Sequence, residues 1–369
     1  MRHHVSQQLM RWFNVLFVEY FPVGEAGDSE WSKVHDRLMI YKPVLPNSPP
    51  GRLYVNEPVT HSLVNRRYAN NIVHVITSLS PKKVLLFNFV YHFPEIMQKK
   101  IFCYKAYVCF DEFPKMQRRS FKRNALKAKY QEILFQHYEN KVARIATHCF
   151  TPHYPLRNKL LRVNKNVEML FHAHNWKLGS KVACQDGDGR IKVAFAGFIH
   201  YRLIDCWLER VLKENDIELY LIGPLNPAYD VNKLTKHQNI RLISALSESE
   251  LLKTLTEMDV LIIPYHTHLP ETEVLTTVSK LYQYILSEKP VVISNMPNFI
   301  RQPKGILYRA DSANDFIAKI RQAHAEDCDE LRALRAKIAA ENTWDKRGEQ
   351  LYDLLKGALG DILPKLEPE

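Results

Sequence analysis

The sequence contains no apolar run of about 18 residues, the length that a helix needs to cross a membrane. Its first residues also lack the pattern of a secretory signal, in which a basic segment is followed by an apolar core and a small-residue cleavage site. These two absences predict a cytoplasmic protein.

Several nucleotide and metal signatures are also absent. Neither GxGxxG nor GxxxxGK[ST] occurs, so the sequence indicates neither a dinucleotide fingerprint nor a Walker loop. The six cysteines are scattered and form no CxxC pair, so buried reduced thiols are expected rather than a structural zinc. Asp186 and Asp188 form a DxD pattern, but their glycine-rich surroundings favour a solvated turn over a metal site.

What is present is a chain of 369 residues, long enough for two domains, with charge divided unevenly along it. Residues 1–176 hold 26 Lys and Arg against 12 Asp and Glu, a charge of +14, whereas residues 177–369 hold 25 against 28, a charge of −3. An anionic partner of the first half is therefore one hypothesis.

Much of the positive charge lies in the segment KMQRRSFKRNALKAK, from residue 115 to residue 129. We consider three interpretations of it: a solvated helix face, a nucleic-acid patch, and a surface that contacts anionic lipid head groups. The solvated face is the default for an isolated charge run, and the charge imbalance of the half favours an anionic surface over that default, with each basic group near an anionic membrane contributing about 1 kcal/mol. The candidate membrane-facing residues are Lys115, Arg118, Arg119, Lys122 and Arg123.

Strands and helices are predicted to alternate along both halves. Strands are expected over 14–20, 37–41, 53–56, 83–88, 106–110, 144–150, 167–171, 191–196, 217–222, 240–244, 260–263, 290–294 and 306–309. Helices are expected over 2–10, 60–79, 116–141, 155–161, 202–213, 247–258, 272–289, 313–325, 328–340 and 344–359. This alternation predicts an α/β protein with two parallel sheets.

We therefore predict two Rossmann-like domains that face a cleft, the default place for a site. The first covers residues 1–178, a polar linker covers 179–190, and the second domain covers 191–345. The C-terminal helix and tail, 346–369, are expected to cross back to the first domain.

The stretch from residue 260 to residue 295 combines a buried strand, a helix with Lys280 and a second buried strand. Such units bind ligands at the carboxyl ends of their strands, where a lysine early in a helix stabilises an anion. Most helix lysines are surface residues, which is the alternative for Lys280. Gly197 and Gly223 each follow an apolar strand, and they indicate either tight turns or a close approach to a diphosphate.

Asp111 ends the predicted strand AYVCFD in the first half. A carboxylate in that position suits a general base for an acceptor hydroxyl, and it equally suits the N-cap of the next helix. Glu112 is the second candidate for the base.

These segments resemble a known family. The second half is similar to the nucleotide-sugar domain of GT-B glycosyltransferases in AFAGFIHYRLID, ELYLIGP, VLIIPYH, VSKLYQYILSEKPVVIS and TWDKRGEQLYDLL, and the first half is similar more loosely in RHHVSQQLM, NVLFVEY and YVCFDEF. The order and spacing resemble bacterial surface-polysaccharide enzymes of the teichuronic-acid and xanthan glucuronosyltransferase type.

The resemblance implies roles for individual residues. Lys280 would contact the diphosphate and Gln283 the ribose or the diphosphate, while Ser279, Tyr265 and the turn at Gly197 and Phe198 would hold the nucleotide together with Gly223. Asp111 would be the base of an inverting reaction. The resemblance also implies a reaction without a bound metal or other cofactor.

The sequence departs from the family in three places. Leu275 and Gln283 stand where retaining members have two glutamates, which favours inversion. Glu288 stands where a glycine is usual, and at a left-handed position it would cost roughly 1 kcal/mol. Relatives begin with a strand and loop ahead of RHHVSQQLM, so either this start is a downstream one or the N-terminal sheet is one strand short.

The expected function is transfer of a sugar from a nucleotide diphosphate sugar, a UDP-sugar above all, to a hydroxyl of a lipid-linked or polysaccharide acceptor. The enzyme would act in the cytoplasm, on the anionic inner face of the cell membrane, and would not bind nucleic acid. A nucleotide-sugar epimerase of the same fold and a non-catalytic nucleic-acid-binding protein are the alternatives.

Overall fold

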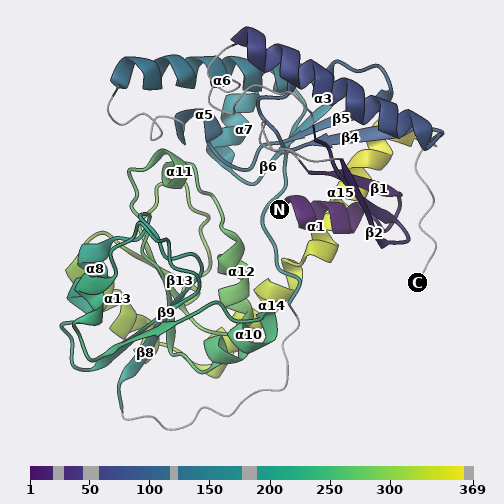
Figure 1. The fold of residues 1–369 in the computed structure, drawn as a ribbon. Helices are drawn as coiled ribbons and strands as arrows, with labels where there is room; N and C mark the ends of the chain where they lie inside the picture. The colour runs from purple at the N-terminus through teal and green to yellow at the C-terminus, as the bar shows by residue number, and fades with distance from the viewer. Residues whose placement is uncertain (20–28, 45–57, 117–123, 177–188, 361–369) are drawn as a thin grey trace. The chain divides into compact units, whose positions relative to one another are not determined.

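The computed structural model describes residues 1–19, 29–44, 58–116, 124–176 and 189–360 (Figure 1). The chain forms two compact units. The first unit consists of Met1–Leu170 and Gly348–Glu369, and the second consists of Phe171–Arg347. Most of the linker predicted over 179–190 lies outside the described residues.

The described part of the first unit contains two sheets. Its strands are β1 (Val15–Val18), β2 (Glu30–His35), β3 (Leu38–Lys42), β4 (Val84–Asn88), β5 (Phe102–Val108), β6 (His148–Thr151) and β7 (Val167–Met169). Strands β4, β5, β6 and β7 pair in that order in a parallel sheet. Strand β3 pairs in parallel with β1 and antiparallel with β2.

Helices accompany these strands along the chain (Figure 1). They are α1 (Arg2–Leu9), α3 (Pro58–Ser78), α4 (Pro94–Met97), α5 (Phe113–Met116), α6 (Ala125–Ile145) and α7 (Tyr154–Leu160). Helix α15 (Trp344–Leu359) enters the first unit at Gly348, where an added Cβ would lie 2.1 Å from Oε1 of Gln8. Trp12 packs on Tyr352 of α15, with ring centroids 5.0 Å apart, so α15 lies against the α1 region.

The second unit is built on one parallel sheet. Its strands are β8 (Ile191–Ala196), β9 (Ile217–Ile222), β10 (Ile240–Ile243), β11 (Val260–Ile263), β12 (Val291–Ser294) and β13 (Leu307–Ala310). Their order is β10-β9-β8-β11-β12-β13, and every pairing is parallel. The chain runs outward from β8 on one side and from β11 on the other, so the strand order reverses between these two strands, the place where such sheets bind ligands.

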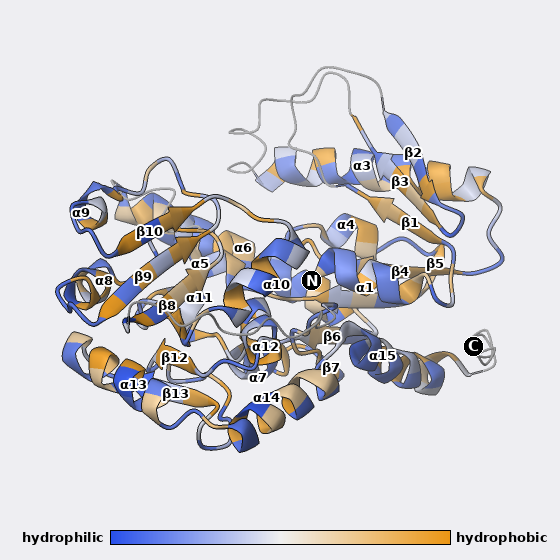
Figure 2. Cartoon of the chain, turned by 90° about the horizontal axis from the view of Figure 1, so that it is seen from below, coloured by the Kyte–Doolittle hydropathy of each residue, from blue (hydrophilic) through white to orange (hydrophobic). Residues whose placement is uncertain are grey.

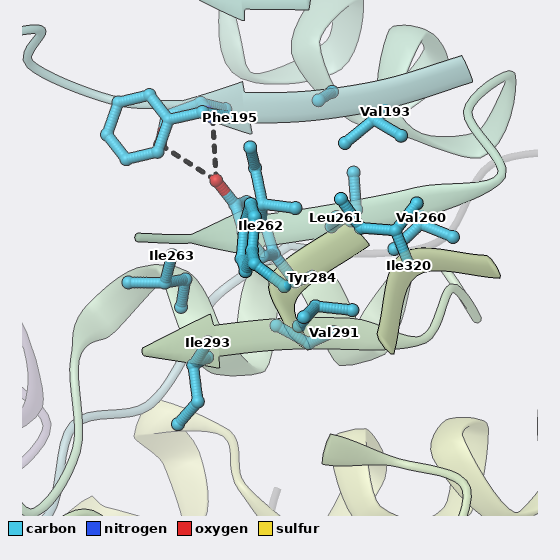
Figure 3. Packing of buried hydrophobic residues seen from close by; sticks show 14 of the residues in the cluster. Val193, Phe195, Val260, Leu261, Ile262, Ile263, Tyr284, Val291, Ile293 and Ile320 are labelled. Atoms are coloured by element: carbon cyan, nitrogen blue, oxygen red, sulfur yellow. Dashed lines mark hydrogen bonds between the residues drawn. The ribbon is translucent and has the colours of Figure 1, made fainter. Parts of the chain in front are cut away.

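The described helices of the second unit follow their strands in sequence. They are α8 (Asp205–Val211), α9 (Asn232–Thr235), α10 (Glu248–Thr256), α11 (Pro270–Glu273), α12 (Ser279–Leu286), α13 (Ala313–Ala325) and α14 (Asp329–Glu341). All residues of β11 and β12 are buried, as strands covered on both faces require. Figure 3 shows Val260, Ile262 and Val291 among the buried apolar side chains of this sheet, and Figure 2 shows apolar residues along β8 and β9.

The α/β class with parallel sheets is confirmed, and several predicted elements are wrong in detail. The single helix predicted over 116–141 is interrupted, because Asn124 is extended (φ −139°, ψ 91°) and caps α6 by accepting the N–H of Lys127. The strand predicted over 144–150 begins later, since α6 continues to Ile145. Strand β2 was not predicted, because its residues are all exposed and carry no apolar alternation.

Two other expectations differ from the structure. The helix predicted from Thr272 is two helices, α11 and α12, separated by residues 274–278. Of the cysteines that the structure describes, Cys103, Cys206 and Cys328 are exposed rather than buried, and all are free thiols. The predicted left-handed position of Glu288 is confirmed, with φ of 63°.

Candidate functional site

Lys280 lies at the start of helix α12 because the chain leaves the helical conformation before it. Val278 is extended (φ −129°, ψ 150°) and forms the N-cap, so Ser279 and Lys280 are the first two residues of the helix. Backbone N–H groups in a first helical turn have no partner within the helix and favour anions. The break between α11 and α12 therefore moves Lys280 from the interior of the predicted helix to its N-terminus.

The ammonium group of Lys280 is held over aromatic rings. Its Nζ donates to the hydroxyl of Tyr265 at 2.8 Å and lies 3.8 Å from the ring centroid of Phe195. It forms no ion pair with a carboxylate in the part of the chain that the structure describes. Burial lowers the pKa of Lys280 well below its usual range, and the charge of Arg202 lowers it further. A bound anion would stabilise the charged form.

The two predicted glycines lie side by side beside this lysine, since β8 pairs with β9. Both have positive φ, 140° at Gly197 and 132° at Gly223. A Cβ on Gly197 would lie 2.7 Å from Nζ of Lys280, and one on Gly223 would lie 2.3 Å from the carbonyl oxygen of Gly197. Their N–H groups already donate to Ile222 and Ile243. The glycines therefore provide space, and their own N–H groups are committed to the sheet.

A cavity of about 280 Å³ opens at this point, at the carboxyl ends of β8 and β11. Six of the seven residues predicted to bind the donor line it: Gly197, Phe198, Tyr265, Ser279, Lys280 and Gln283. Gly223 is the seventh and lies behind Gly197. Their role in binding a nucleotide stays a prediction.

Several residues that line the same cavity were not predicted: Trp176, Ala196, His200, Leu251, Leu255 and Tyr284. Tyr284 fixes α12 to the sheet, because its hydroxyl accepts the N–H of Ala196 at 2.6 Å and donates to the carbonyl oxygen of Ala196 at 3.1 Å (Figure 3). Tyr284 lies one helical turn after Lys280, and this spacing could have indicated that it lines the same cavity. Trp176 lies too far away in sequence for any local pattern to place it here.

Glu271 connects the two loops that border the cavity. This fully buried carboxylate accepts a hydrogen bond from the hydroxyl of Tyr201 at 2.9 Å and lies 3.9 Å from Nε of Arg202. The backbone of the same loops is joined where His266 donates to the carbonyl of Arg202. The two loops are thus held together independently of any ligand, and neither Glu271 nor Arg202 was predicted.

Asp111 lies in the first unit, three residues after β5, and is partly exposed. Its Oδ1 accepts the N–H of Glu112 at 3.0 Å. This contact lies in the turn before α5 and is not the side-chain bond of an N-cap, so the N-cap alternative for Asp111 also stays a prediction. The role as a base stays a prediction.

Glu112, the second candidate for the base, is buried and ion-paired. Lys159 Nζ lies 2.8 Å from Oε1 of Glu112 and 2.8 Å from Oε2 of Glu139. Burial opposes the charge of Lys159, but the two carboxylates outweigh it and raise the pKa of Lys159. Glu112 is therefore part of a buried charge cluster with Lys159 and Glu139, and its contacts are structural.

The predicted membrane-facing residues are mostly beyond the described ranges. Lys115 is exposed at the end of α5, while Arg118, Arg119, Lys122 and Arg123 lie outside the described residues. Asp186 and Asp188 also lie outside them. In the described ranges no three His, Cys, Asp or Glu side chains are grouped as metal ligands, and the expected independence of metal stays a prediction. No helix within those ranges is long and apolar enough to span a bilayer.

The sequence matches no protein-family model and no curated protein sequence. Solved structures, in contrast, match nearly its full length. The chain is similar to sucrose-phosphate synthase from Thermosynechococcus elongatus, with a TM-score of 0.69, 12% identity and coverage of 97% of this chain and 92% of that one. It is also similar to a UDP-forming α,α-trehalose-phosphate synthase from Burkholderia xenovorans (TM-score 0.65, 12% identity, 94% of each chain).

A third similar structure is WaaG, a glycosyltransferase involved in lipopolysaccharide biosynthesis (TM-score 0.60, 11% identity, 96% of this chain and 95% of that one). At this level of identity the similarity establishes the fold. The chain has the GT-B fold of glycosyltransferases, built from two Rossmann-like units. The narrower resemblance to teichuronic-acid and xanthan enzymes stays a prediction.

Proposed function

We propose that the protein transfers a sugar from a nucleotide diphosphate sugar, with a UDP-sugar as the expected donor, to a hydroxyl of a lipid-linked or polysaccharide acceptor. The proposal rests mainly on the position of Lys280. This lysine lies in the first turn of α12, forms no ion pair with a carboxylate in the described chain, and lines a cavity at the place where the strand order of the parallel sheet reverses. The fold supports it, because similar structures include a UDP-forming synthase.

Lys280 would stabilise the negative charge that develops on the leaving diphosphate. The first turn of α12 would add its N–H groups to the same anion. Ser279 lies in this turn and Gln283 one turn later, on the lining of the cavity, where they can hydrogen-bond the nucleotide. Phe198 is 46% exposed and offers an apolar face beside the same cavity.

Asp111 would accept the proton of the acceptor hydroxyl in an inverting reaction. Inversion is proposed because Leu275 and Gln283 replace the paired glutamates of the retaining pattern. We expect the reaction to require no metal or other cofactor. No feature of the described residues favours an epimerase or a nucleic-acid-binding protein over this activity.

The enzyme would bind its acceptor at the surface of a membrane. The excess charge of residues 1–176 and the basic segment that begins at Lys115 support docking on the anionic inner face of the cell membrane, with the protein in the cytoplasm. WaaG, a similar structure, takes part in lipopolysaccharide biosynthesis, which agrees with a lipid-linked or polysaccharide acceptor.

The donor site is tested by titrating UDP into Lys280→Met in a calorimeter. Methionine keeps most of the length of the side chain and removes its charge, so affinity should fall about tenfold or more, as expected for loss of a charged hydrogen bond. The exposed Lys236 provides the matched control Lys236→Met, which should bind UDP like the unchanged protein. Equal affinity in the Lys280 variant would refute the assignment of the donor site.

Proton uptake separates a direct contact from a structural role of Lys280. Because its pKa is lowered in the free protein and an anion raises it, UDP binding should take up protons, and affinity should decrease as pH rises between these two pKa values. Binding enthalpies measured in buffers of different ionisation enthalpy report this uptake. The uptake should disappear in Lys280→Met, and its persistence there would assign it to another group.

A further inference from the structure

A second cavity, of about 400 Å³, lies in the first unit and contains none of the residues discussed above. Helices α3 and α6 and the short helix α4 enclose it, and α4 packs against both longer helices. His61 of α3 stacks on Tyr138 of α6, with ring centroids 4.4 Å apart, which fixes the spacing of the two helices. Figure 1 shows the long helices α3 and α6 of this unit.

Two buried polar groups in this cavity have no protein partner among the described residues. Glu95 is 8% exposed and its Oε2 accepts no hydrogen bond, and Tyr138 is 5% exposed with an unpaired hydroxyl. Both residues line the cavity, and burial raises the pKa of Tyr138 to about 12, with a further contribution from the charge of Glu95. Buried polar groups are normally paired, and those that are not indicate a missing partner.

Two cations lie on the lining of the same cavity. Arg66 lies one turn after Ser62 on α3, and Lys141 lies three residues after Tyr138 on α6. Both are exposed, and neither forms an ion pair within the described ranges. Together with Glu95 they carry a charge of +1, which a phosphodiester would neutralise. Glu95 and Tyr138 would in turn bond the hydroxyls of the same ligand.

Apolar side chains lie next to the lining residues on both helices. Val59 and Leu63 on α3, and Leu126, Tyr130 and Ile133 on α6, are each at least half exposed. Figure 2 shows the alternation of apolar and polar residues along α3. Exposed apolar groups beside basic ones are typical of surfaces that contact a bilayer. This pattern favours a lipid over a free phosphate ester as the ligand.

We propose that the cavity binds the head group of an anionic phospholipid that carries free hydroxyls, with its phosphodiester between Arg66 and Lys141 and its hydroxyls at Glu95 and Tyr138. This inference rests on the membrane association proposed above and does not depend on sugar transfer.

The test measures co-sedimentation with phosphatidylcholine vesicles that contain either phosphatidylglycerol or phosphatidylmethanol. These two lipids carry the same phosphodiester charge, but only the first has head-group hydroxyls. The protein should prefer phosphatidylglycerol, and Glu95→Gln and Tyr138→Phe should each reduce that preference. Equal binding of the two lipids by the unchanged protein would overturn the proposal.

The charge arm compares two double variants on the same helices. Arg66→Ala with Lys141→Ala should weaken binding to phosphatidylglycerol vesicles about tenfold, whereas Arg67→Ala with Arg144→Ala, outside the cavity, should change it about twofold or less. Equal losses would show that only overall charge matters and would reject the cavity as the site.

Competition by a soluble phosphate ester tests whether the head group that binds belongs to a lipid. Glycerol 1-phosphate should compete with the vesicles, but weakly, because it lacks the acyl chains. Tight binding of glycerol phosphate without binding to vesicles would overturn the lipid assignment. UDP titrations of the same variants should be unchanged, so failure here is distinguishable from failure of the donor site.

Discussion

At the scale of single residues, the two carboxylates after β5 have opposite environments although they are neighbours in sequence. Asp111 is partly exposed and accepts the N–H of Glu112, whereas Glu112 is buried against Lys159. Glu112 shares Lys159 with Glu139, so its removal would break one charged hydrogen bond and leave the second ion pair in place, at a cost of about 1–3 kcal/mol. The two positions can therefore be separated by experiment.

We predict that Asp111→Asn abolishes turnover while leaving UDP affinity and thermal stability nearly unchanged, because asparagine keeps the shape and cannot accept the proton. Sugar transfer from UDP-sugars and calorimetry with UDP measure the two effects.

Glu112→Gln is the contrasting variant. It should lower the free energy of unfolding by about 1–3 kcal/mol through loss of the charged hydrogen bond to Lys159, which keeps Glu139 as its partner. If Asp111→Asn retains turnover, a residue other than Asp111 acts as the base.

Residues of the candidate site could be predicted only where the strands and helices next to them in sequence indicate where they lie in the fold. Gly197 follows an apolar strand, and Lys280 lies early in the helix that follows the strand at 260–263, so both could be placed at the carboxyl edge of a sheet. Phe195, Arg202 and Glu271 could not, because their importance comes from contacts between segments that are distant in sequence. Tertiary contacts of this kind leave no periodic signal.

At the scale of elements, the interruption between α11 and α12 shows why the start of a helix was misjudged. Thr276 and Thr277 are fully buried, and the carbonyl of Thr276 accepts the N–H of Ile300 rather than that of a residue four positions later. A helix-like apolar pattern continues through this segment, so periodicity alone extended the helix to Thr272. The end of the same helix was predicted at residue 289, before Pro290, whereas α12 ends at Leu286.

We predict that Glu288→Gly stabilises the second unit by about 1 kcal/mol, because only glycine adopts positive φ without a Cβ penalty. Chemical denaturation measures this difference. Glu288→Ala is the control, since alanine keeps the Cβ and should give no such gain. A gain of equal size in both variants would attribute it to loss of the glutamate side chain instead.

At the scale of the whole molecule, alternating strands and helices were sufficient to predict an α/β chain with two Rossmann-like units. The order of the strands was not predictable, since it depends on which strands pair after long connections. That the strand order reverses between β8 and β11 could be recognised only from the structure. The same holds for the lipid-binding cavity, whose lining comes from three separate helices.

The stability of the molecule should depend on pH through buried histidines of the first unit. Burial lowers the pKa of His61 to about 3, of His92 to about 4 and of His153 to about 3. In the unfolded chain these side chains titrate near 6.5, so below that pH the unfolded state binds more protons than the folded state. Stability is therefore fully present above about pH 6.5 and decreases as pH falls toward 4.

We predict that the free energy of unfolding, measured by urea denaturation between pH 7.5 and 5, decreases with a slope that approaches about 1.4 kcal/mol per pH unit for each of these histidines. His61→Gln removes one titrating group and should reduce the slope by about that amount, whatever it does to stability at pH 7.5. His74→Gln, an exposed position on the same helix α3, sets the baseline for loss of a histidine. If the two variants show equal slopes, burial of His61 does not control the acid sensitivity of the protein.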